Sequence, residues 1–251
     1  MINFDATFFA FAVPAVIFAG VSKGGFGSGA SFASAAILAL ILPPELALGM
    51  MLPLLMLIDV SALRTYWGQW SFADCRRILI GSLPGVALGA AVFNYANPDV
   101  IRFLIGAIAL AFVAWQLGKT RGWVPAPKEK LGVTAGVSTG AVAGFTSFVS
   151  HAGGPPVAVY LLSQQLDKLT YQASTVLIFW LINVFKFGPY AALGAFTADT
   201  WIAVAMLAPV ALFGTWLGVK AHRLVPERAF FAITYVLLVL TGTRLIWVAV
   251  T

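Results

Sequence analysis

Long apolar runs separated by short polar connections fill almost the whole sequence. Most of the runs are long enough for a helix to cross a hydrocarbon layer of ~30 Å. The pattern therefore predicts an all-α, polytopic membrane protein. We distinguish ten apolar runs, at residues 4–22, 29–43, 46–63, 77–95, 98–118, 131–149, 153–165, 171–192, 200–219 and 229–250.

The two halves of the chain resemble copies of one unit of five apolar runs. An ordered series of residues recurs at an offset of 124 or 125 positions, and such internal similarity is typical of transporter folds. The predicted organisation is a first transmembrane repeat at 1–118, a linker loop at 119–130 and a second repeat at 131–251. The matching pairs include Gly20 and Gly144, Gly29 and Gly153, Asp74 and Asp199, Pro84 and Pro209, and Gly89 and Gly214.

Basic residues near the ends of the runs indicate how the two repeats are oriented, because Lys and Arg gather on the cytoplasmic side. The three clusters share one side if each repeat crosses the membrane an odd number of times, which would invert the second repeat. Both termini are then expected outside and the 119–130 loop in the cytoplasm. Whether residues 29–43 and 153–165 cross fully or re-enter stays open. The clusters are Arg64/Arg76/Arg77, Lys119/Arg121/Lys128/Lys130 and Lys220/Arg223/Arg228.

Composition narrows the class of protein further. Of the 251 residues, 61% are hydrophobic and 10% are charged, whereas soluble domains carry roughly 25% charged residues. The formal net charge of +6 comes from residues in short loops, so we interpret it as a topology signal and not as a nucleic-acid-binding patch. The single cysteine, Cys75, excludes an intrachain disulfide. The first run lacks a basic segment before it and is expected to be a retained helix.

Two glycine-rich breaks interrupt the apolar runs at equivalent places in the two halves. The first is G-V-S-K-G-G-F-G-S-G, at 20–29, and the second is G-F-T-S-F-V-S-H-A-G-G-P-P, at 144–156. Interrupted helices free backbone polar groups, which protein or a water-filled cavity must then satisfy. In transporters, discontinuous helices commonly end at the substrate site.

The chemistry of the breaks favours an anion. Helices that begin near Ser28 and Pro155 would point unpaired N–H groups at the breaks, where oxyanions bind readily. Lys23 adds a full positive charge that a bound anion or a nearby carboxylate would compensate. The predicted substrate-binding residues are Ser22, Lys23, Gly24, Gly25, Gly27, Ser28, Ser31, Thr146, Ser147, Ser150, His151, Gly153, Gly154 and Pro155.

Asp59, Asn183 and Lys186 also interrupt apolar runs, and ionisable residues inside a membrane are functional candidates. Asp59 either pairs with Lys23 or Lys186, or takes up a proton in a coupled transport cycle. Structural alternatives exist as well: Lys23 could reach the membrane interface, the glycines could serve close helix packing, and His151 could be a packing residue. Ser147 and His151 lack a third group that would orient them for hydrolysis, so we expect no enzyme activity.

The breaks S-K-G-G-F-G-S-G and H-A-G-G-P-P-V-A-V-Y-L-L, within a duplicated chain, resemble those of the sulfite exporter TauE/SafE family of membrane permeases. The resemblance covers essentially the whole chain. It implies about eight helices, a bacterial inner membrane, no cofactor and the movement, often outward, of sulfur oxyanions or organosulfonates. Many members have a Pro-Leu-Leu stretch after a denser glycine run; here the first break continues S-G-A-S-F-A-S-A-A, which leaves the substrate open.

The function expected from the sequence is secondary transport of a small anion such as sulfite, sulfoacetate or another organosulfonate. Alternating access would expose a site between the breaks to each side in turn, and His151 or Asp59 would couple protons. The alternatives are a passive anion channel and a cation carrier that uses Asp59 and Gln164. No G-x-x-x-x-G-K-[ST] motif is present, so ATP-driven transport would need another subunit. No metal or nucleic-acid partner is expected.

Overall fold

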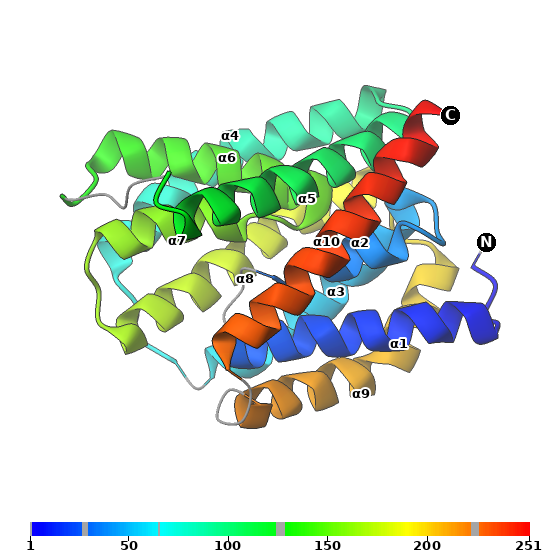
Figure 1. Cartoon of the computed structure of the whole chain (residues 1–251), viewed down its shortest axis with the longest axis horizontal. Coiled ribbons are helices and arrows are strands. Elements are labelled where there is room, and N and C mark those ends of the chain that lie inside the picture. The colour runs from blue at the N-terminus through cyan, green and yellow to red at the C-terminus, as the bar shows by residue number, and fades with distance from the viewer. Residues whose placement is uncertain (1, 27–29, 65, 124–128, 222–225) are drawn as a thin grey trace.

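The computed structural model describes residues 2–26, 30–64, 66–123, 129–221 and 226–251. Within these residues the chain forms ten α-helices and one π-helical turn, η1, and has no strand (Figure 1). The helices are α1 (Ala6–Val21), α2 (Ala33–Leu38), α3 (Pro44–Leu63), α4 (Phe72–Tyr95), α5 (Pro98–Thr120), α6 (Val133–Ser150), α7 (Gly154–Ser163), α8 (Lys168–Ala192), α9 (Ala198–Ala221) and α10 (Glu227–Val250), and η1 comprises Ser22–Phe26.

Each of the ten apolar runs contains one helix, which confirms the all-α polytopic prediction. Eight helical segments of the described chain are long and apolar enough to span a membrane, and the two that are not are α2 and α7. Local sequence sets several boundaries. The Asp5 side chain caps α1 by accepting a hydrogen bond from the Phe8 backbone N–H, and Asp167 caps α8 through the N–H groups of Leu169 and Thr170.

Both termini lie at one end of the helix bundle (Figure 1). The backbone N–H of Ile2 donates to Asp199 Oδ2 at 2.8 Å, which places the start of α1 beside the start of α9. The α6 helix begins at the opposite end of the bundle (Figure 1). The first helices of the two halves therefore run in opposite directions, as an inverted arrangement requires. The inverted repeat itself stays a prediction.

The short helix α7 turns back toward the end of the bundle where α6 begins. Its ten residues extend for about 15 Å, half of a membrane core. The backbone N–H of Leu131, just before α6, donates to Ser163 Oγ at 3.3 Å, and Gln164 Nε2 donates to the Leu131 carbonyl at 2.9 Å. The run at 153–165 is therefore the returning arm of a hairpin. Helix α2, with six residues, is also too short to cross.

The described members of the three basic clusters belong to the same end of the bundle as the start of α6; Lys128 and Arg223 lie outside the described residues. Arg76 and Arg77 lie near the start of α4, Lys119 in the last turn of α5, and Arg228 in the first turn of α10. Lys119 and Arg228 line one shared cavity at this end. This grouping agrees with the charge pattern, while its assignment to the cytoplasm stays a prediction.

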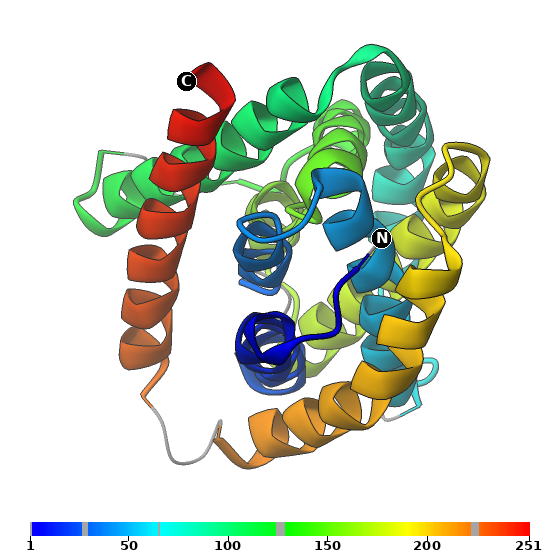
Figure 2. The same cartoon turned by 90° about the vertical axis from the view of Figure 1, so that its right-hand side faces the viewer.

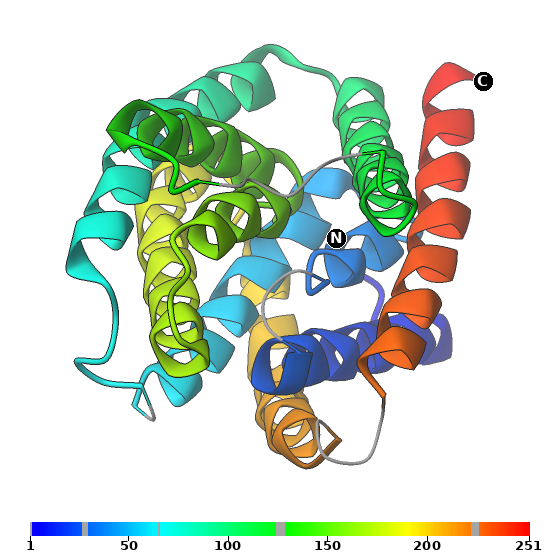
Figure 3. The same cartoon turned by 60° about the vertical axis from the view of Figure 1, so that its left-hand side comes forward.

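The strongest helix contacts join the two halves. Helix α1 packs on α9, α4 packs on α6, and α3 packs on α8 in the interior. Helices α5 and α10 form a separate outer pair, visible in green and red in Figures 2 and 3. Small residues allow these approaches: an added Cβ at Gly25 would collide with the Gly218 carbonyl, and one at Gly140 would collide with that of Ile78.

Candidate functional site

A group of buried polar side chains lies between the two breaks. We call Lys23, Asp59, Ser147, His151, Asn183 and Lys186 the central polar cluster. They come from η1, α3, the end of α6 and α8, and each is less than 10% exposed to solvent. The fold thus brings together residues from both halves that the sequence had marked as polar interruptions of apolar runs.

Lys23 forms an ion pair with Asp59. Lys23 Nζ lies 2.6 Å from Asp59 Oδ1, and Asn183 Nδ2 donates to Asp59 Oδ2 at 2.9 Å, so both oxygens of the carboxylate accept a hydrogen bond. With 7% exposure, the Lys23 side chain does not reach an interface. A carboxylate therefore compensates the lysine, and Asp59 pairs with Lys23 in preference to Lys186.

The second break holds His151 in a left-handed backbone conformation, with φ of 57°. Non-glycine residues adopt this conformation uncommonly, and such residues cluster at functional sites. Here it ends α6 as a C-terminal cap, in which the His151 N–H donates to the Ser147 carbonyl at 2.9 Å. The turn directs the imidazole into the central polar cluster instead of along the helix.

Lys186 joins α8 to this turn. Its Nζ donates to the Ser147 carbonyl at 2.9 Å and to Ser147 Oγ at 3.0 Å, and it lies 2.7 Å from His151 Nδ1. His151 Nε2 lies 3.1 Å from the Leu48 carbonyl, which can only accept, so Nε2 carries the proton. A neutral ring then leaves Nδ1 free to accept from the Lys186 ammonium group.

The formal charges of the central polar cluster do not cancel. With both lysines protonated, Lys23 and Lys186 supply two positive charges, against one negative charge on Asp59. The aromatic rings of Phe179 and Tyr190 have their centroids 5.9 Å from Lys23 Nζ and 6.0 Å from Lys186 Nζ, respectively. A buried excess of positive charge is stabilised by an added anion.

The space within the central polar cluster is small. The cavity there measures about 10 Å³, which is at the lower limit for one water molecule. A multi-atom oxyanion needs a wider site than this conformation provides. It would have to displace internal contacts, such as that between Lys23 and Asp59. The cavity is lined by Lys23, Ser31, Leu55, Ser147, His151, Phe179 and Asn183.

Several predicted substrate-binding residues serve their own helices instead. Thr146 Oγ1 donates within its helix, with Val142 O at 2.9 Å, and Ser150 Oγ donates to Thr146 O at 3.0 Å. An added Cβ at Gly24 would lie 2.5 Å from the Thr215 carbonyl oxygen, so this glycine provides close packing of η1 on α9, as Gly25 does. Gly153 likewise packs closely, on Ala143, Ser147 and Phe179.

Of the two predicted helix starts, the one after the first break is wrong. The helix after the first break begins at Ala33 and not near Ser28, and it is a six-residue segment without a side-chain cap. Gly27 and Ser28 lie outside the described residues. Helix α7 begins at Gly154, as expected, with a proline in its first turn; Gly154 and Pro155 face a separate cavity. Ser22 and Ser31 are buried, and Ser31 lines the small cavity within the cluster.

Three contributors to the site were missed by the sequence analysis. The Leu48 carbonyl accepts from His151, and no property of the leucine side chain signals this role. Tyr190 OH donates to the Phe148 carbonyl at 2.5 Å, and its position one turn after Lys186 could have marked it. Phe179 faces Lys23 from one turn before Asn183.

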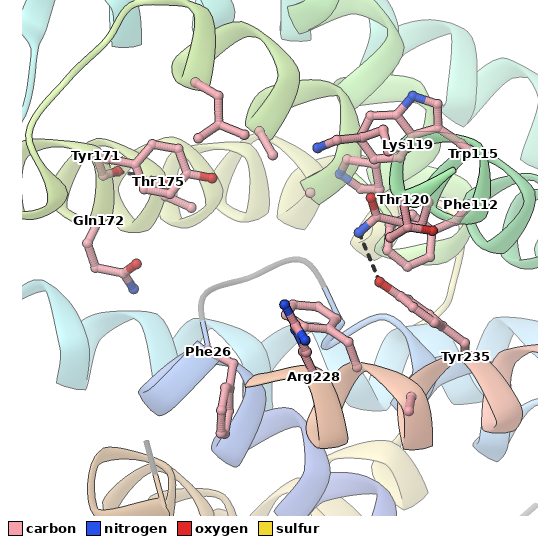
Figure 4. A pocket seen from close by; sticks show the side chains of 17 residues that line it. Phe26, Phe112, Trp115, Lys119, Thr120, Tyr171, Gln172, Thr175, Arg228 and Tyr235 are labelled. Atoms are coloured by element: carbon pink, nitrogen blue, oxygen red, sulfur yellow. Dashed lines mark hydrogen bonds between the residues drawn. The ribbon is translucent and has the colours of Figure 1, made fainter. Parts of the chain in front are cut away.

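A much larger cavity, of about 840 Å³, opens at the end of the bundle that carries the basic clusters. Figure 4 shows Lys119 and Trp115 of α5 facing Tyr171 and Thr175 of α8 across it. Along a third side, Gln116 Nε2 of α5 donates to Tyr235 OH of α10 at 3.2 Å. We call this the α5–α10 cavity.

An all-helical, polytopic protein with a buried cationic cluster between two helix breaks belongs to the membrane transporters. The sequence profile of one transporter family, described as Sulfite exporter TauE/SafE, matches residues 12–245. The chain therefore belongs to the sulfite exporter TauE/SafE family, a family of transporters and not of enzymes, whose description implies a small anion as substrate. No curated protein and no solved structure matches the chain.

Proposed function

We propose that the protein is a secondary transporter that exports a sulfur-containing anion, sulfite or an organosulfonate, across the bacterial inner membrane by alternating access. The observation that carries the proposal is the central polar cluster, in which two buried lysines accompany a single carboxylate that contacts one of them, Lys23. Its position, between breaks from both halves, is where transporters with inverted repeats bind substrate.

In this proposal the substrate competes with Asp59 for Lys23. The anion takes the place of the carboxylate beside Lys23 Nζ, and the Lys186 ammonium group and Ser147 hydroxyl provide further donors. The contact between Lys23 and Asp59 must break, since the cavity of about 10 Å³ has no room for the anion beside it. Rearrangement of the breaks then widens the site toward one side of the membrane.

Proton coupling follows from the same exchange. When an anion displaces Asp59, the carboxylate loses its cation but keeps the hydrogen bond from Asn183. A buried carboxylate without a counter-charge is costly, so uptake of a proton by Asp59 restores the charge balance. His151 is the second coupling candidate, because protonation of its ring would disrupt the contact with Lys186.

The two alternatives from the sequence receive less support. In the cation carrier, Asp59 would be the ligand, but Lys23 and Asn183 occupy both of its oxygens. Gln164 lies away from the cluster and bonds the Leu131 carbonyl. Among the described residues, no group of three or more His, Cys, Asp or Glu side chains could hold a metal ion. A passive channel would need a wider path than the cluster offers here.

The experiment that tests the proposal is counterflow in proteoliposomes with labelled sulfite and sulfoacetate. We expect saturable, trans-stimulated exchange in the wild type and its loss in Lys23→Gln. Arg76→Gln, which removes an exposed positive charge at the start of α4, is the matched control and should transport normally. Non-saturable flux would identify a channel, and flux of cations alone would overturn the proposal. A His151→Gln variant with unchanged rate and pH profile would leave Asp59 as the coupling group.

A further inference from the structure

The α5–α10 cavity has a composition unlike that of a lipid-facing groove. It is formed by the ends of α5, α7, α8 and α10 together with Phe26 of η1. Two cationic side chains, Lys119 and Arg228, come from opposite members of the outer helix pair. Lys119 Nζ lies 4.9 Å from the centroid of the Trp115 ring, in cation–π geometry.

The aromatic lining of the cavity determines which anions fit it. Trp115, Tyr171 and Phe231 offer flat apolar surface close to the two cations. A bare oxyanion would use the cations but would leave this surface in contact with water. An organic anion, with a sulfonate head and a carbon-containing body, uses both. A side-chain amide donor is also at hand, since Gln172 lines the same space.

The cavity also leads toward both breaks. Phe26 lies three residues after Lys23, and Gly154 lies three residues after His151, and both line the cavity. A second and smaller cavity, of about 380 Å³, lies at the opposite end and is lined by Arg102 and Arg244 of the same helix pair. The α5–α10 cavity is therefore the larger of two cavities beside α5 and α10 that are lined by cationic side chains.

We propose that the α5–α10 cavity is a second binding site, at which an organic anion such as an alkyl- or arylsulfonate is loaded before it reaches the central polar cluster. Lys119 and Arg228 hold the charged head, and Trp115 contacts the organic body. The inference rests on the proposed function and narrows its substrate class, because it favours organosulfonates over sulfite.

Binding at this site is measurable through Trp115, which lines the cavity. Purified protein is titrated with ethanesulfonate, benzenesulfonate and sulfite while tryptophan fluorescence is recorded. The Trp115→Phe variant identifies the part of the signal that belongs to this residue. We expect saturable changes with the two sulfonates and a much weaker response to sulfite. An equal or stronger response to sulfite would overturn the assignment to organic anions.

Variants locate the charge contacts. We expect Lys119→Gln/Arg228→Gln to weaken sulfonate binding at least about tenfold, equivalent to ~1.4 kcal/mol. Arg76→Gln, with an exposed side chain at the same end, should leave it unchanged. An anionic lipid shares the chemistry of the ligand, so the titration is repeated in nanodiscs with and without phosphatidylglycerol. Binding of the soluble sulfonates in both supports the proposal, and a Lys119- and Arg228-dependent signal from lipid alone overturns it.

The central polar cluster provides the test that separates the two proposals. Lys23→Gln should abolish transport and keep the Trp115 signal, because Lys23 does not line the α5–α10 cavity. A wild-type protein that binds sulfonates through Trp115 without transporting any anion would contradict the proposed function alone. Anion transport without a Trp115 signal would contradict the loading site alone.

Discussion

The two breaks occupy equivalent places in the two halves, yet they are built differently. The first continues α1 as the π-helical turn η1 and carries Lys23. The second stops α6 with the left-handed residue His151 and restarts as α7. At the offset of 124, Lys23 corresponds to Ser147 and Asp59 to Asn183. The second half thus has a neutral pair where the first half has an ion pair.

In the predicted repeat, this difference would give a duplicated chain a one-sided site. Asn183 donates directly to Asp59, so two equivalent positions of the halves are in contact. Such self-contacts are typical near a two-fold axis and support the inverted repeat. Of the corresponding positions Asp59 and Asn183, only Asp59 carries a charge, and Lys23 is its lysine partner. The other lysine, Lys186, contacts Ser147 and His151.

The largest expected effect comes from removing the carboxylate. Asp59→Asn leaves the buried Lys23 without its counter-charge, and loss of one partner of a buried pair costs about 3–5 kcal/mol. We expect a large fall in the melting temperature in detergent and loss of transport. Asp99→Asn, in an exposed pair with Arg102, is the control and should melt like the wild type. An unchanged melting temperature in Asp59→Asn would show that the pair contributes no stability.

The double variant Lys23→Ser/Asp59→Asn gives the first half the neutral pair of the second. Both charges are gone, so the stability lost in Asp59→Asn should return in large part, by about 2 kcal/mol. Transport stays absent because the cation that binds the anion is missing. Thermal unfolding of the two single variants and the double variant completes the cycle. Additive losses would mean that Lys23 and Asp59 act independently.

The packing of the first break is tested by Gly25→Ala. The new methyl group would meet the Gly218 carbonyl and force η1 away from α9, at a cost of about 1–3 kcal/mol. Gly188→Ala, where nothing lies within 4 Å of an added Cβ, is the matched control in α8 and should be neutral or stabilising. If both variants unfold at the same temperature, the close approach of η1 and α9 is not needed.

The smallest expected effect is that of Thr146→Val in the second break. The hydroxyl of Thr146 bonds carbonyl groups of its own region, including Ala152 at 3.1 Å, and not the central polar cluster. We expect a loss of about 1 kcal/mol in stability and an unchanged KM for the transported anion. A raised KM would indicate that Thr146 contacts the substrate after all.

Sequence patterns predicted the helices well, because most apolar runs have the length and hydropathy of a helix in a membrane. They also marked Lys23 and His151 as substrate-binding candidates, and Asp59, Asn183 and Lys186 as polar groups inside the membrane, since such groups inside apolar runs must find partners. Local periodicity could not show which partner each would take. Asp59 pairs with Lys23 and not with Lys186, and this choice depends on how α3 and α8 cross.

The predictions for the small residues were less accurate for a different reason. Glycine permits close approach both to a ligand and to another helix, and the sequence does not distinguish the two. Gly24 and Gly25 proved to face α9. Similarly, Thr146 and Ser150 satisfy backbone carbonyls of their own helix, a common use of hydroxyl groups in apolar surroundings. The Leu48 carbonyl lies in a regular helix and leaves no trace in the sequence.

The ion pair between Lys23 and Asp59 has a consequence for the transport cycle. A carrier with an unbalanced charge in its centre resists the return from one side to the other when it carries no cargo. In the proposed cycle the carboxylate takes the place of the cargo, so the empty carrier moves one uncompensated positive charge and not two. Such a carrier would complete the empty half of its cycle more easily than one without the ion pair. It would then release substrate in net amounts and would not depend on one-for-one exchange.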